Sequence, residues 1–142
     1  MIERHPSTIV ETFVRLVTPL VQLFALYVLA FGHYSPGGGF QAGVIFGATY
    51  ILSGLALGEE TLKARVNERV CLAFGAAGVL AYTVTGLFGM LGGGEFLDYA
   101  ALPLPVDDVR ARYFGILFIE VGVAMAVAAT VTLIFMRLGR RA

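Results

Sequence analysis

The 142-residue chain is 58% apolar and only 14% charged, and its formal net charge at pH 7 is zero. Soluble domains contain about 45–50% apolar and about 25% charged residues, so this chain has too few polar residues to cover a globule in water. The balanced charge gives no indication of nucleic-acid binding. We therefore predict an all-α integral membrane protein with about four transmembrane helices, in a single membrane domain over residues 1–142.

The first predicted helix covers about residues 8–31. No charged residue occurs from Leu16 to Gly58, a run of about 43 residues, whereas one membrane span needs only about 20. The run must therefore contain a break. Pro36 and the glycines at 37–39 supply it, because neither residue type continues a stable helix.

The second predicted helix covers about residues 40–57, and the third and fourth cover about 67–91 and 109–138. Between the last two lies a segment, 92–108, that combines three consecutive glycines, two prolines and four acidic residues. These residue types favour turns and loops. We therefore expect a non-helical, extracytoplasmic segment at the membrane surface and not a fifth span.

Lysine and arginine are distributed unevenly around the predicted spans. Eight of the ten lie near the N-terminus, in or next to the connection between the second and third spans, or near the C-terminus. Four spans place these three regions on the same side of the membrane. The other two, Arg110 and Arg112, lie on the opposite side. Because cytoplasmic loops carry the excess of Lys and Arg, we expect both termini to be cytoplasmic and the protein to be a multi-pass protein of the cell membrane.

Small residues recur along one face of the predicted helices. Such faces let helix backbones approach closely, which drives packing where lipid supplies no hydrophobic force. Two uses are open, namely packing within the four-helix unit and docking of other subunits. The main candidates are Gly39, Gly43, Gly47 and Gly54 in the second helix, Gly75 and Gly78 in the third, and Gly122 in the fourth.

Glu120 is the acidic residue that lies well inside an apolar span, between Phe114–Ile119 and Val121–Met125. A carboxylate at mid-membrane costs at least ~2.5–3.5 kcal/mol on insertion scales, and such residues usually face a protein interior, a water cavity or an ion path. Burial favours the protonated form of a carboxyl group. Glu120 is therefore a candidate proton or cation relay, and the alternative is an acid that only locks helices together.

His33 lies at the expected outer end of the first helix. A lone interfacial histidine is most often a polar boundary residue, and the alternative is a proton donor on an ion path. The sequence contains no nucleophile–base pair and no cluster with the spacing of metal ligands. We therefore expect a non-catalytic protein without a metal site or a cofactor.

Two motifs resemble the MnhB/MrpB family. The family signature is Gly-His, two variable residues and Pro-Gly-Gly-Gly-Phe, followed about one turn later by a glycine. Glu120-Val121-Gly122-Val123 is similar to the family's acid-x-Gly-Val segment in its last helix. The first motif is matched here by Gly32, His33, Pro36, Gly37, Gly38, Gly39, Phe40 and Gly43.

The resemblance implies a four-span accessory subunit of Mrp-type multisubunit Na+/H+ antiporters, and related subunits occur in membrane-bound hydrogenase-type complexes. It implies other subunits as partners, a lipid surround, and Na+ and H+ as transported ions. We therefore predict a subunit that packs against its neighbours and lines an ion path with Glu120. Two alternatives stay open: a purely structural scaffold subunit, and a self-sufficient small transporter that forms a homo-oligomer.

Overall fold

The computed structural model describes residues 7–32, 34 and 37–139. Within this part of the chain all regular structure is helical, and four helices are long and apolar enough to span a membrane. The prediction of an all-α protein with about four spans is thereby confirmed. Each of these helices begins and ends within one residue of its predicted bounds. They are α1 (Thr8–Ala30), α2 (Gly39–Leu57), α4 (Glu68–Leu91) and α5 (Asp108–Gly139).

The connection between α2 and α4 contains a short helix that the sequence pattern did not predict, α3 (Glu59–Arg65). Gly58 has a φ of 91°, in the left-handed region that favours glycine, and so permits the sharp turn out of α2. Leu62 of α3 is fully buried and lies against Gly54 of α2. One leucine among charged residues is too weak a pattern to predict a helix. In the structure, however, this leucine packs α3 against the end of α2.

The segment between α4 and α5 is largely non-helical, but it includes one turn of 3-10 helix, η1 (Tyr99–Ala101). The Asp98 carboxylate accepts a hydrogen bond of 3.1 Å from the Ala100 amide at the start of this turn. The segment folds back onto the helices, with Phe96 against Gly86 of α4 and Tyr99 against Gly115 of α5. It therefore covers the ends of α4 and α5.

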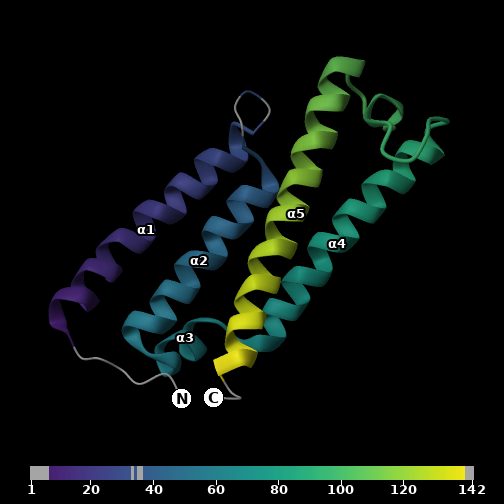
Figure 1. Cartoon of the computed structure of the whole chain (residues 1–142). Helices are drawn as coiled ribbons and strands as arrows, with labels where there is room; N and C mark the ends of the chain where they lie inside the picture. The colour runs from purple at the N-terminus through teal and green to yellow at the C-terminus, as the bar shows by residue number, and fades with distance from the viewer. Residues whose placement is uncertain (1–6, 33, 35–36, 140–142) are drawn as a thin grey trace.

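The four long helices form a row in the order α1, α2, α5 and α4 (Figure 1). α5 packs extensively against both α2 and α4, whereas α1 packs mainly against α2. α1 begins, and α5 ends, at the end of the molecule where α3 lies, and the segment 92–107 lies at the other end (Figure 1). The last helix of the chain therefore lies inside the row, between α2 and α4.

Glycines allow these close approaches. A Cβ atom on Gly43 of α2 would lie 2.7 Å from the carbonyl oxygen of Ala124 in α5, and one on Gly47 would lie 3.1 Å from Val131 Cβ. On the other side of α5, a Cβ atom on Gly122 would lie 2.8 Å from the carbonyl oxygen of Gly78 in α4. These small-residue faces are used within the chain, as membrane helix packing favours.

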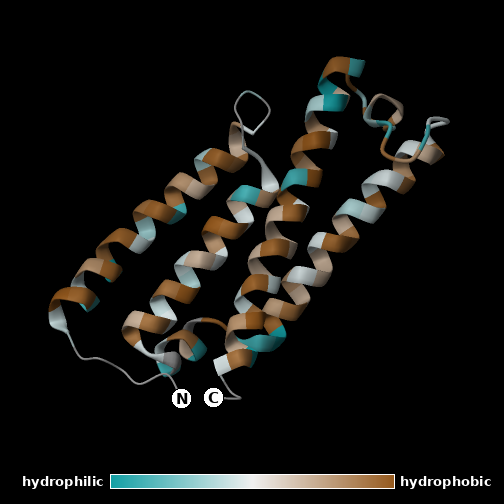
Figure 2. Ribbon diagram, in the orientation of Figure 1, coloured by the Kyte–Doolittle hydropathy of each residue, from teal (hydrophilic) through white to brown (hydrophobic). Residues whose placement is uncertain are grey.

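The outward faces of the row are apolar. Figure 2 shows hydrophobic residues along most of the long helices, with hydrophilic residues mainly near their ends and in α3. Large side chains such as Leu23 on α1 (65% exposed) and Leu80 on α4 (61% exposed) point away from the other helices. A surface of this kind suits lipid or neighbouring membrane subunits and not water.

Candidate functional site

The carboxyl group of Glu120 on α5 lies against the turn that joins α1 to α2. A Cβ atom placed on Gly32 would lie 3.1 Å from each carboxylate oxygen, and one placed on Gly38 would lie 3.2 Å from Oε1. The Oε2 atom is buried. The glycine-rich motif and the acidic motif, which are far apart in the sequence, therefore form one site.

Glycine is required at this site for two reasons. Gly38 has a φ of 148°, a backbone conformation that other residues rarely adopt. Gly39 packs directly against the main-chain carbonyl group of Glu120, which leaves no room for a side chain. The glycines thus let the turn reach the backbone of α5 and bring the carboxyl group into contact with main-chain atoms.

The start of α2 gives this site a particular electrostatic character. The Ala42 amide donates to the Gly38 carbonyl over 3.0 Å, so the amides before Ala42 form the unpaired N-terminal end of the helix. The positive end of the helix dipole favours a negative charge nearby, whereas membrane burial opposes it. The start of α2 and the membrane surroundings therefore have opposite effects on a negative charge at Glu120.

The remaining motif positions have different surroundings. A Cβ atom on Gly37 would lie 3.2 Å from Val28 Cγ1 on α1, so Gly37 faces the end of that helix. The Phe40 side chain is 64% exposed on the surface of the row. His33 and Pro36 lie outside the described residues.

A polar contact between α1 and α2 was not predicted from the sequence. Gln22 Nε2 donates to Thr49 Oγ1 over 3.2 Å, and Thr49 in turn donates to the Phe46 carbonyl over 2.7 Å. The sequence feature that could have indicated this contact is Gln22, an amide side chain inside an uncharged span. Such an amide needs hydrogen-bond partners when it is buried. Gln22 therefore joins α1 to α2 within the predicted membrane region.

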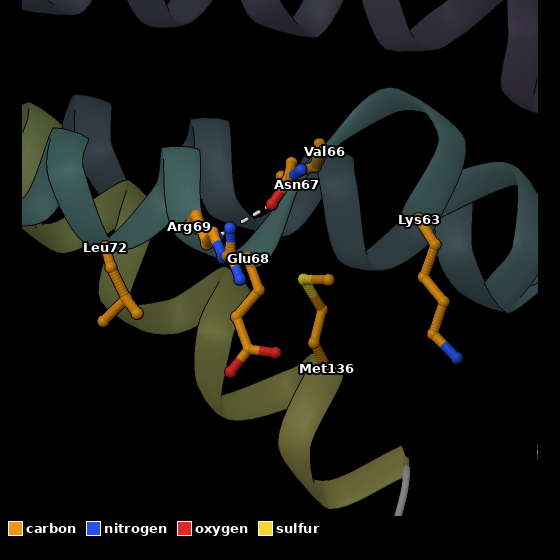
Figure 3. Close-up of a pocket in the computed structure, with 7 residues that line it drawn as sticks. All are labelled: Lys63, Val66, Asn67, Glu68, Arg69, Leu72 and Met136. Atoms are coloured by element: carbon orange, nitrogen blue, oxygen red, sulfur yellow. Dashed lines mark hydrogen bonds between the residues drawn. The ribbon is translucent and has the colours of Figure 1, made fainter.

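Charged residues from different helices meet at the end of the molecule that holds α3. Arg137 of α5 and Glu68 of α4 form an ion pair with an N–O distance of 2.7 Å. Beside this pair lies a surface pocket of about 500 Å³, and Figure 3 shows Lys63, Glu68 and Met136 around it. Within residues 7–32, 34 and 37–139, no three His, Cys, Asp or Glu side chains gather as a metal site would require.

Comparison with known proteins identifies the family. Residues 9–133 match the model of a family described as a domain related to the MnhB subunit of Na+/H+ antiporter. The chain belongs to the MnhB family. The predicted resemblance is confirmed, and the glycine-rich motif at 32–43 and Glu120 both lie inside the matched region of this MnhB-family chain.

Relatives with similar lengths support the same assignment. The MnhB-family chain is 30% identical to a Na(+)/H(+) antiporter subunit of Bacillus subtilis (strain 168) over 137 residues, which cover 91% of this chain and 95% of the relative. It is 32% identical to "Putative antiporter subunit mnhB2" of Staphylococcus aureus (strain Newman) over 134 residues, which cover 87% and 93% of the two chains. The similarity therefore extends over nearly the full length of each relative.

Proposed function

We propose that this chain is a membrane subunit of a multisubunit Na+/H+ antiporter in the cell membrane, and that Glu120 lines part of its ion path. Membership of the MnhB family and four apolar helices support the first part. The observation that carries the second part is the contact of the Glu120 carboxyl group with Gly32 and Gly38 at the α1–α2 turn.

In this proposal Glu120 exchanges a proton or binds a cation beside the α1–α2 turn, about 18 Å along α5 from Asp108 at 1.5 Å per residue. A dry environment favours the protonated carboxyl group, whereas the start of α2 and a passing Na+ favour the carboxylate, so a proton and Na+ would compete for the same group. The chain itself supplies one acidic group in the path. The rest of the path is supplied by neighbouring subunits of the antiporter.

The proposed orientation places both termini in the cytoplasm, with the α1–α2 turn and residues 92–108 outside. Basic residues support it. Figure 1 shows that α1 begins and α5 ends at the end of the molecule that holds α3. Arg15 lies in the first half of α1, Lys63 in α3 and Arg137 in the last turn of α5. Arg110 and Arg112 at the start of α5 lie at the other end. The outer end is therefore the end near Glu120.

Neighbouring subunits are proposed to cover the outward faces of α1 and α4, with lipid on the remaining surface. These faces carry exposed apolar side chains, such as Leu16 (63%) and Val79 (59%). Gly39, Gly43 and Gly47 face α5 of the same chain and so offer no surface to a second copy. We therefore favour a subunit of a hetero-complex over a homo-oligomeric transporter, and a membrane-bound hydrogenase-type complex is the alternative assembly.

Glu120→Gln in the native complex tests the ion-path role. The amide keeps the size of the side chain and removes its ability to ionise, so antiport should fall while assembly is retained. Glu95→Gln is the matched control, since it makes the same chemical change at an exposed position in the segment between α4 and α5. Na+/H+ exchange in everted vesicles and the subunit content after gentle detergent extraction are the two measurements.

The outcomes distinguish an ion-path role for Glu120, a structural role, and no role in either antiport or assembly. Lost antiport in a fully assembled Glu120→Gln complex supports the ion path. Unchanged antiport and unchanged assembly would overturn it, and lost assembly alone would assign Glu120 the role of a scaffold contact. Recovery of the wild-type chain as a discrete small homo-oligomer, and not in a large hetero-complex, would overturn the proposed subunit function.

A further inference from the structure

A partly open cavity of about 250 Å³, lined by both polar and apolar residues, lies between α1, α2 and α3, away from the Glu120 site. Its polar lining comes from Thr18 and Gln22 of α1 and from Tyr50 and Ser53 of α2. Leu57 and the fully buried Leu62 also line it. The volume is sufficient for several water molecules, because each needs roughly 10–15 Å³ of probe-occupied space.

The hydroxyl group of Thr18 has no hydrogen-bond partner among the described residues although its Oγ1 is buried. Thr18 as a whole is only 8% exposed. The four other buried hydroxyl residues in the described chain each donate to a main-chain carbonyl of their own helix. They are Thr49, Ser53, Thr85 and Thr132. Because an unpaired buried hydroxyl is costly, Thr18 requires a partner from the cavity that it lines.

Pro19 places a second unpaired polar group on the same face of α1. Proline has no amide hydrogen, so the Arg15 carbonyl lacks its usual donor four residues later in the helix. Arg15, Thr18, Pro19 and Gln22 follow the spacing of one helix face, and all four line the cavity. Thr18, with its unpaired hydroxyl, and Arg15, whose carbonyl Pro19 deprives of its usual donor, therefore line the same space.

The chemistry of the lining favours a neutral polar occupant. None of the described residues that line the cavity carries a carboxylate, and Arg15 contributes a positive charge at its edge, which opposes a bound cation. Water satisfies both a hydroxyl and a carbonyl and occupies polar cavities of this kind. We propose that the cavity is a hydrated pocket in which water binds Thr18 and the Arg15 carbonyl.

The pocket brings water into the membrane-spanning part of the chain. From Arg15 to Gln22 it extends about 10 Å along α1, at 1.5 Å per residue, and reaches the middle of the helix. From Tyr50 to Gly39, where Glu120 lies, α2 continues for roughly 16 Å. The pocket is thus separate from the Glu120 site, and its hydration does not depend on the role proposed for Glu120.

Cysteine accessibility in the assembled complex tests the pocket. Cys71, the single native cysteine, is first removed by the substitution Cys71→Ala. Thr18→Cys is then treated in membranes with the small reagent methyl methanethiosulfonate, and the thiol left unmodified is measured after denaturation. A cysteine in contact with water should react about 10-fold faster or more than one without water, because only the thiolate is nucleophilic.

Two controls match Thr18→Cys in residue type and position. Thr132→Cys starts from the same residue type at 1% exposure and lies outside the cavity, and Leu20→Cys lies two residues further along α1 on its outward face. Ser53→Cys probes the same pocket from α2 and serves if Thr18→Cys fails to assemble. Fast labelling of Thr18→Cys or Ser53→Cys, with slow labelling of both controls, supports the proposal. The proposal is overturned if Thr18→Cys and Ser53→Cys are labelled no faster than Thr132→Cys. A lipid chain or a neighbouring subunit in the cavity would produce that result.

Discussion

Gly39 at the start of α2 packs directly against the main-chain carbonyl group of Glu120 in α5. The contact joins the turn after the first helix to the last helix of the chain. It also fixes the position of Glu120 relative to the start of α2, because the backbones of the two helices are in contact there. A substitution at Gly39 therefore acts on the packing of two helices and on the position of the acidic group.

Gly39→Ala should destabilise the subunit, because the added methyl group would overlap the Glu120 carbonyl. Overpacking of this kind costs about 1–3 kcal/mol or more. Gly75→Ala is the control, since its Cβ would meet Ala129 Cβ at an ordinary 3.4 Å. Thermal unfolding in detergent measures both variants. A Gly39→Ala variant as stable as Gly75→Ala would contradict the observed packing.

Gly38→Ala should reduce antiport more than it reduces assembly, because its Cβ would lie 3.2 Å from the Oε1 atom of Glu120. The substitution also strains the backbone, since Gly38 has a φ of 148°. Gly93→Ala separates the two effects, because Gly93 also has a positive φ, 91°, and has nothing within 4 Å of an added Cβ. Antiport per assembled complex is the measurement. Equal losses in the two variants would show that backbone strain alone is responsible.

Gly86→Ala should displace the segment after α4. The added methyl group would overlap the ring of Phe96, which holds residues 92–98 against the helix. We expect a loss of about 1–3 kcal/mol from overpacking and faster proteolysis between Gly92 and Asp107. The double variant with Phe96→Leu should regain part of the stability because the smaller side chain leaves space. No recovery in the double variant would exclude the Phe96 contact as the cause.

Arg137→Glu should lower stability only slightly, by less than about 1 kcal/mol, because exposed ion pairs contribute little. The Arg137 side chain is 64% exposed although its distance to Glu68 is 2.7 Å. Combining it with Glu68→Arg restores opposite charges between α4 and α5. The double variant should be more stable than Arg137→Glu at low salt, and this difference should shrink at high salt. A difference that does not depend on salt would indicate a packing effect and not an ion pair.

Local residue patterns were sufficient to predict the four spans and the break between the first two. The uncharged run from Leu16 to Gly58 is too long for one span, and Pro36 with its glycines marks the turn. The short helix α3 was missed, because its sequence is mostly charged and its buried Leu62 packs against Gly54 of α2. The sequence of α3 alone does not show that α2 offers a surface for Leu62.

The sequence by itself determined which segments enter the membrane, that Glu120 is an unusual residue inside one of them, and which family the motifs resemble. Only the tertiary structure decided that α5 lies between α2 and α4 and that Glu120 meets Gly32 and Gly38. It also decided that Thr18 lines a cavity with Ser53. The physical reason is that these helices are apolar on nearly every side, so hydropathy gives their depth in the membrane but not the face that meets a neighbour.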